Sequence, residues 1–104
     1  MAEVTFRIDP MHLELMNRRM SEYLALNYER STLCRIVEEY SELEAEEERS
    51  WNIRVRYQGR DLLIEYRITL DADEWPEVLL EGPDGFIEEL DVEVVRPVLE
   101  EFEG

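Results

Sequence analysis

The first part of the sequence has a strand pattern followed by a helix pattern. Apolar and polar residues alternate over residues 3–8, EVTFRI, as in a strand with one buried face. Asp9 then suits a helix N-cap, and Pro10 suits the first helical position, where its missing N–H costs nothing. The apolar side chains that follow recur at spacings of three and four and predict an amphipathic helix; they are Leu13, Met16, Met20, Tyr23 and Leu24.

A second apolar stripe keeps helical spacing but would lie on roughly the opposite side of the same helix, at about 100° per residue. Its members are Leu33, Ile36, Val37, Tyr40 and Leu43. One straight helix would need two cores, so we expect a break within residues 26–32. Asn27 suits a left-handed C-terminal residue, and Ser31 or Thr32 suits a new N-cap. The second helix is then expected to end at residues 46–48; one long helix packed on opposite sides at its two ends is the alternative.

From Ser50 the period of the pattern changes to two, which predicts a β-hairpin. The second arm alternates over residues 62–70 after the turn QGRD, and the inward side chains of the first arm are Trp51, Ile53, Val55 and Tyr57. The loop DADEWP and the short strand EVLLEG come next. We expect GPDG, residues 82–85, to form a tight turn with Gly85 at a positive φ.

The segment 86–102 supports two patterns. Residues 90–94 alternate as in a strand, whereas a spacing of four indicates a helix through Phe86, Leu90, Val94, Val98 and Phe102. We expect a strand as far as Val95, followed by a short helix opened by Pro97.

Together these elements predict a single α+β domain over residues 1–104. It comprises an N-terminal strand, two helices or one long broken helix, an antiparallel meander of three to four strands and a short C-terminal helix. Hydrophobic residues make up 44 % of the chain, enough to bury one core. Cys34 is the single cysteine and no stretch reads as a signal peptide or a membrane span, so a cytoplasmic setting is expected.

Charge is distributed unevenly along the chain. There are 27 Asp and Glu residues against 11 Arg and no Lys, for a formal net charge of -16. Residues 1–37 carry a net charge of 0 and residues 49–69 carry +3, while residues 38–48 carry -7 and residues 70–104 carry -12. Phosphate affinity comes from Lys and Arg, so this balance argues against direct binding to a nucleic acid or an anionic membrane. It favours a basic protein partner.

Residues that support catalysis or hold a cofactor are sparse. His12 is the only histidine, so the sequence has no zinc cluster and no convincing nucleophile–base pair with Cys34. Asp71, Asp73 and Glu74 alternate like the start of a calcium loop, but the glycine and the later glutamate of such a loop are missing. The four glycines form no phosphate-binding loop. We therefore expect no enzyme activity, no cofactor and no metal site.

Two acidic patches are the expected partner-binding residues. The first patch holds Glu39, Glu42, Glu46 and Glu47, and the second holds Asp71, Asp73, Glu74, Trp75 and Glu77. Glutamates in a last helical turn oppose the helix macrodipole by about 0.3 to 1 kcal/mol each, which favours a role other than stability. We expect Trp75, ahead of Tyr28, to be an aromatic anchor of the interface.

An internal role for the first patch is the alternative. The acidic helix would then cover the polar face of the hairpin and form ion pairs with its arginines, which are Arg54, Arg56, Arg60 and Arg67.

In composition and charge placement alone, the chain resembles small acidic proteins that imitate the phosphate array of DNA. Such proteins occupy the basic groove of a nuclease, restriction enzyme or CRISPR complex, and they share no fold or motif. The expected function is therefore a DNA-mimic inhibitor of the anti-restriction or anti-CRISPR type, of phage or bacterial origin, whose partner binds nucleic acid. Two alternatives stay open: an immunity protein or secretion chaperone that caps a basic toxin or effector, and a homodimeric structural module joined through its helices.

Overall fold

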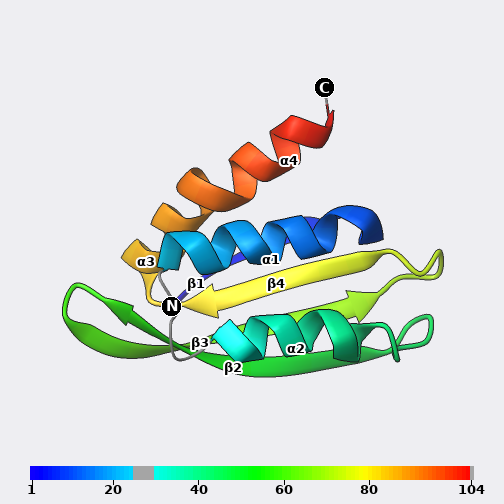
Figure 1. The fold of residues 1–104 in the computed structure, drawn as a ribbon, viewed down its shortest axis with the longest axis horizontal. Coiled ribbons are helices and arrows are strands. Elements are labelled where there is room, and N and C mark those ends of the chain that lie inside the picture. The colour runs from blue at the N-terminus through cyan, green and yellow to red at the C-terminus, as the bar shows by residue number, and fades with distance from the viewer. Residues whose placement is uncertain (25–29, 104) are drawn as a thin grey trace.

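The computed structural model describes residues 1–24 and 30–103 and has the predicted α+β class (Figure 1). The strands are β1 (Ala2–Arg7), β2 (Glu48–Tyr57), β3 (Arg60–Leu70) and β4 (Pro76–Gly82). The helices are α1 (Pro10–Leu24), α2 (Arg30–Tyr40), α3 (Asp84–Leu90), the π-helical turn η1 (Asp91–Val95) and α4 (Arg96–Glu103).

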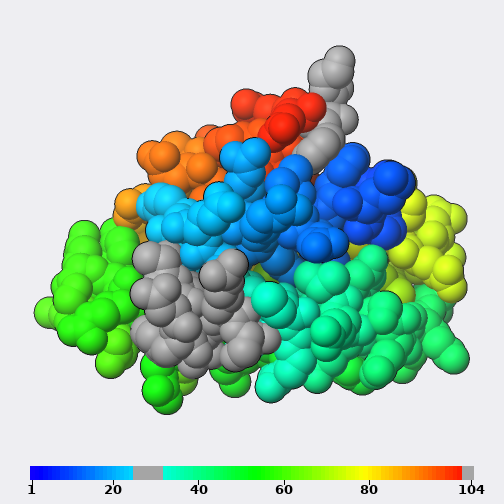
Figure 2. Space-filling model, in the orientation of Figure 1, coloured from blue at the N-terminus to red at the C-terminus, as the bar shows by residue number. Residues whose placement is uncertain are grey.

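The four strands form one antiparallel sheet in the order β1-β4-β3-β2, so β1 and β2 are its edges. Alternate side chains of β2, β3 and β4 are buried, and the buried set lies on the face that the helices cover (Figure 1). No described helix covers the opposite face, which is mostly polar but includes Leu63, 63 % exposed, and Leu79. Figure 2 shows the helical face, where the side chains of α1, α2 and α4 form a continuous layer.

The predicted start of the first helix is confirmed. The backbone N–H of Met11 donates to Asp9 Oδ1 at 2.9 Å, so Asp9 is a side-chain cap before Pro10. The predicted stripe of α1 faces the core: its side chains at residues 13, 16 and 20 are fully buried, whereas Tyr23 at its end is partly exposed.

Two helices are present rather than one long helix, because α2 runs back alongside α1 in the opposite direction (Figure 1). Most of the predicted break, including Asn27, lies outside the described residues. Ser31 and Thr32 lie within α2, so the prediction that one of them is its N-cap is wrong.

The predicted end of the second helix is also wrong, because α2 ends at Tyr40 instead of continuing to residues 46–48. Glutamate favours helix, but here tertiary pairing overrides that preference. The backbones of Glu46 and Glu47 bond with Leu70 and thus extend the β2–β3 ladder. These glutamates therefore do not oppose a helix macrodipole.

The hairpin is confirmed, with a shorter turn than expected. Gln58 and Gly59 have φ values of 50° and 77°, as in a type I′ turn, and Tyr57 pairs directly with Arg60. Its inward side chains complete the core against the helices; they are Trp51, Ile53, Val55, Ile64, Tyr66, Ile68 and Leu70.

The C-terminal prediction is wrong in two respects. GPDG is not a tight turn, because α3 begins at Asp84 and Gly85 is helical without a positive φ. No strand runs to Val95 in the described chain; instead α3, η1 and α4 follow one another without a gap. The spacing of four prevails because it buries the side chains of residues 86, 90, 94 and 98 together, whereas Val92 is 54 % exposed.

The π-helical turn has a local explanation. Arg96 donates its backbone N–H to the carbonyl of Asp91, five residues earlier, and Pro97 comes next without an N–H of its own. A proline ring inside an α-helix clashes with the carbonyl four residues before it. The wider turn relieves this clash and lets the helical run continue through Pro97 instead of starting there.

Candidate partner-binding surface

Apart from Glu39, which lies on α2, the residues of the two predicted acidic patches come together at one end of the sheet. Glu46 donates its backbone N–H to the carbonyl of Leu70 at 2.8 Å, and Leu70 donates its own N–H to the carbonyl of Glu47 at 2.9 Å. Asp71 follows Leu70 directly, so loop 41–47 ends beside the start of loop 71–75. We call these two loops, with the adjoining Glu48 and Glu77, the acidic end; it lies opposite the hairpin turn (Figure 1).

The first loop is closed by its own glutamates. Glu47 Oε1 accepts the backbone N–H of Glu44 at 2.7 Å, and the N–H of Glu47 donates to the carbonyl of Glu44 at 3.1 Å. Glu46 has a φ of 69°, in the left-handed region. The side chains of all three residues are exposed, so the turn holds the carboxylates of Glu44 and Glu46 toward solvent.

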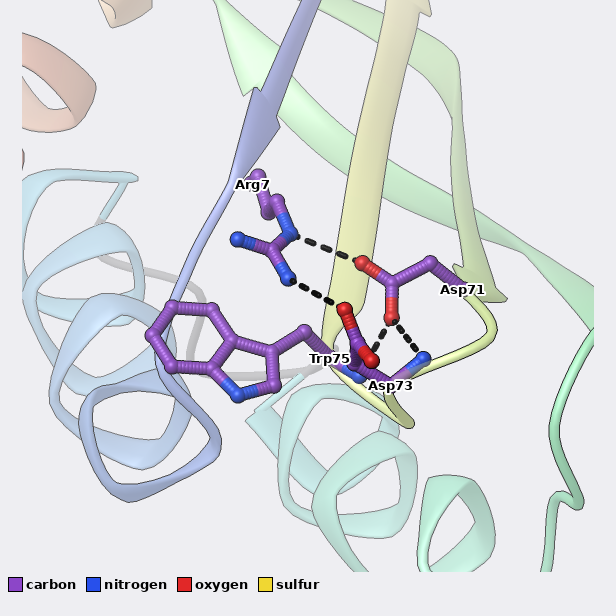
Figure 3. Close-up of polar contacts among 4 residues, drawn as sticks. All are labelled: Arg7, Asp71, Asp73 and Trp75. Atoms are coloured by element: carbon purple, nitrogen blue, oxygen red, sulfur yellow. Dashed lines mark hydrogen bonds and ion pairs between the residues drawn. The ribbon is translucent and has the colours of Figure 1, made fainter.

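The second loop is organised around Asp71. Its Oδ1 accepts the backbone N–H groups of Asp73 and Trp75, each at 2.9 Å, and its Oδ2 accepts Arg7 Nε–H at 2.7 Å (Figure 3). The Trp75 N–H and then the Arg7 side chain are the leading causes that lower the pKa of Asp71. Asp71 is therefore a structural residue of the loop whose charge is largely satisfied within the protein.

Arg7 also covers Trp75 and neutralises part of this patch. Its guanidinium carbon lies 4.4 Å from the centroid of the Trp75 ring, and its Nη2 lies 3.8 Å from Asp73 Oδ2 (Figure 3). Trp75 is half-buried, with one ring face under Arg7. Trp75 is therefore only partly accessible to a partner. Tyr28, the second candidate anchor, lies outside the described residues.

Glu39 and Glu42 differ in what they contact. Glu39 is half-buried, accepts a hydrogen bond from Trp51 Nε1–H, and lies 3.6 Å from Arg35 Nε. It therefore fastens α2 to β2. Glu42 is exposed and lies 3.8 Å from Arg49 Nη1, a surface pair that contributes little to stability.

The exposed carboxylates of the acidic end include two that the sequence interpretation missed, Glu44 and Glu48. The full set is Glu42, Glu44, Glu46, Glu47, Glu48, Asp73, Glu74 and Glu77. The charge run itself was the available signal for the two missed residues. In the structure both residues lie outside a helix, Glu44 in the loop and Glu48 at the start of β2.

The alternative in which the acidic helix pairs with the hairpin arginines is wrong. The polar face of the hairpin is the open face of the sheet, and α2 lies on the other side. Arg56 Nη1 instead lies 3.5 Å from Asp61, and Arg67 Nη2 donates to both oxygens of Glu65 at 3.0 and 3.1 Å. The first acidic patch is therefore not neutralised by these two arginines.

Comparison of the chain with protein-family models, with curated proteins and with solved structures finds no match. Among the described helices, none combines the length and the apolar character needed to cross a membrane. Residues 1–24 and 30–103 contain no group of three or more His, Cys, Asp or Glu side chains placed to hold a metal ion.

Proposed function

We propose that this protein is a non-enzymatic binding protein whose acidic end occupies the basic, nucleic-acid-binding surface of a partner protein. The main support is the pairing of Leu70 with Glu46 and Glu47, which gathers two separate acidic segments into one exposed surface. Arg7 and Arg49 are the arginines that form ion pairs with this surface among the described residues. A DNA-mimic inhibitor of the anti-restriction or anti-CRISPR type is the function that this surface fits best.

The acidic end presents a dense array of negative charge. The molecule measures 40 × 29 × 24 Å, and the strands run along its long axis, so the end has the cross-section of the two shorter dimensions. Eight exposed carboxylates share this end, so negative charges are crowded on it as they are along the backbone of DNA. Unlike DNA, this array is held on short, hydrogen-bonded loops and offers no phosphodiester bond to cleave.

Such a surface has two physical consequences for binding. The field of the acidic end steers a basic partner toward it, and added salt weakens the complex as counterions return to both surfaces. An immunity protein or secretion chaperone, whose affinity depends on apolar contacts with one cognate toxin or effector, would show a shallower salt dependence.

The experiment compares two triple variants with the same change of net charge. Glu44→Gln, Glu46→Gln and Glu74→Gln alter the acidic end, while Glu88→Gln, Glu93→Gln and Glu100→Gln alter exposed positions on the C-terminal helices. Immobilised wild type and the control triple should retain the same basic proteins from a lysate, and the acidic-end triple should lose them. Equal retention by all three proteins would refute the assignment of this surface.

A further inference from the structure

β2 is an edge of the sheet, and its outward backbone groups pair with no other strand in the described part of the chain. The bond from Leu70 N–H to the carbonyl of Glu47 fixes which residues of this strand bond to β3, because hydrogen-bonded positions alternate along an antiparallel ladder. These are the odd-numbered positions from 47 to 57. The N–H and C=O groups directed away from the sheet belong to Glu48, Ser50, Asn52, Arg54 and Arg56, all of which are exposed.

This edge is complementary to itself. If two β2 strands pair antiparallel about a two-fold axis at Asn52, Arg56 of each copy lies opposite Glu48 of the other, and Arg54 lies opposite Ser50. The two Asn52 side chains lie side by side at the axis. No like charges face each other, and an ion pair closes each end of the ladder.

Other registers fit less well. An axis at Arg54 sets two arginines directly opposite each other, which is unfavourable. An axis at Trp51 pairs Arg54 with Glu48 but leaves Arg56 beyond the end of the opposite strand. The register about Asn52 overlaps all of the edge positions and agrees with the charges.

The long-range charge distribution favours the same arrangement. Residues 38–48 carry a net charge of -7, and residues 49–69 carry +3. The acidic end and the hairpin turn lie at opposite ends of β2 (Figure 1). Antiparallel pairing therefore brings the basic hairpin of each copy beside the acidic end of the other, which offsets part of the repulsion between two acidic molecules.

We propose that β2 pairs with β2 of a second copy of this chain about Asn52, giving a two-fold dimer with a continuous eight-stranded sheet. The other edge, β1, is shorter, and its Arg7 is already held by Asp71 and Trp75. This dimer is formed by strands, unlike the helix-mediated dimer considered from the sequence. It goes beyond the proposed function and does not depend on the partner's identity.

Sedimentation equilibrium of the full chain tests the edge with two proline variants. Asn52→Pro blocks an outward N–H without removing a β2–β3 bond, and Thr5→Pro does the same on the β1 edge. Wild type and Thr5→Pro should be dimers at micromolar concentrations, and Asn52→Pro should be a monomer with a native circular dichroism spectrum. A monomeric wild type, or dissociation by Thr5→Pro alone, would overturn the proposal.

A charge exchange tests the register without proline. Arg56→Glu should weaken the dimer about tenfold or more, because the two-fold axis repeats each like-charge contact. Adding Glu48→Arg to that variant should restore wild-type affinity, because the ion pair is then re-formed in reverse. A double variant that dimerises no better than Arg56→Glu alone would contradict the pairing of these two positions.

Discussion

The backbone N–H of Leu70 donates to the carbonyl of Glu47 at 2.9 Å, at the point where both acidic segments leave the sheet. Through this bond, residues 41–47 and 71–75 become neighbours although the whole hairpin separates them in sequence. The glutamate run is thereby held in a loop and not in a helix. The proposed function depends on this arrangement, since it joins two charge clusters into one surface.

Arg7 is predicted to stabilise the second acidic loop. Arg7→Gln removes the contact with the Trp75 ring and the ion pair with Asp71, so we expect a loss of about 0.5 to 1 kcal/mol in the free energy of unfolding. Arg18→Gln is the matched control, because Arg18 is exposed and its substitution changes the charge equally. Urea denaturation should rank Arg7→Gln below the control; equal midpoints would show that the contact does not contribute.

Asp71 gives the fold a pH dependence of known sign. Its folded pKa lies below the ordinary value of 3.8, so its contribution to stability is present above that pH and is lost as the pH falls through the folded pKa. Wild type should therefore be more stable than Asp71→Asn at neutral pH, and the difference should shrink below about pH 4. Urea titrations of both proteins across this range measure it. A difference that grows on acidification would contradict the assignment.

A buried polar pair links α1 to the sheet. Tyr66 OH donates to Asn17 Oδ1 at 2.6 Å, and both side chains are buried. Asn17 Nδ2 has no partner among the described residues, so Tyr66→Phe also leaves Oδ1 unsatisfied and should cost about 1 to 3 kcal/mol. Adding Asn17→Leu removes the remaining polar group, so the double variant should lose less than the sum of the two single losses. Strict additivity in a double-mutant cycle would argue against this pair.

The C-terminal helices are tested by two neighbouring valines. Val94 is buried and Val92 is exposed, so Val94→Ala should cost about 2 kcal/mol and Val92→Ala close to nothing. In the strand expected from the sequence, the two side chains would share one face and their losses would be similar. Thermal unfolding of the two variants distinguishes these outcomes.

The sequence predicted those elements whose signals are local. Asp9 and Pro10 specify the start of α1, and the period of two specifies the hairpin. The wrongly predicted residues depend on distant contacts. Glu46 and Glu47 are not helical because their backbones bond with Leu70. In residues 86–102, the apolar residues fit both the period of two of a strand and the spacing of four of a helix. Only the burial of one helical face distinguishes the helix from the strand.

The candidate site was predictable in location but not in detail. The charge runs identified both segments of the acidic end. The ion pair between Arg7 and Asp71 spans 64 positions, and the hydrogen bond from Trp51 to Glu39 joins a strand to a helix, so neither has a sequence signal. Because they make these contacts, Asp71 and Glu39 are structural residues, whereas the carboxylates of the acidic end that remain exposed are the candidates for binding a partner.

Competition with DNA shows whether the acidic end occupies the nucleic-acid-binding surface of its partner. A protein captured through the acidic end would be labelled and bound to the wild-type chain, and duplex DNA would then be added at a fixed salt concentration while anisotropy is recorded. We expect mutually exclusive binding, in which DNA displaces the chain and the chain displaces DNA. A stable ternary complex, with the affinity for the chain unchanged by saturating DNA, would contradict it.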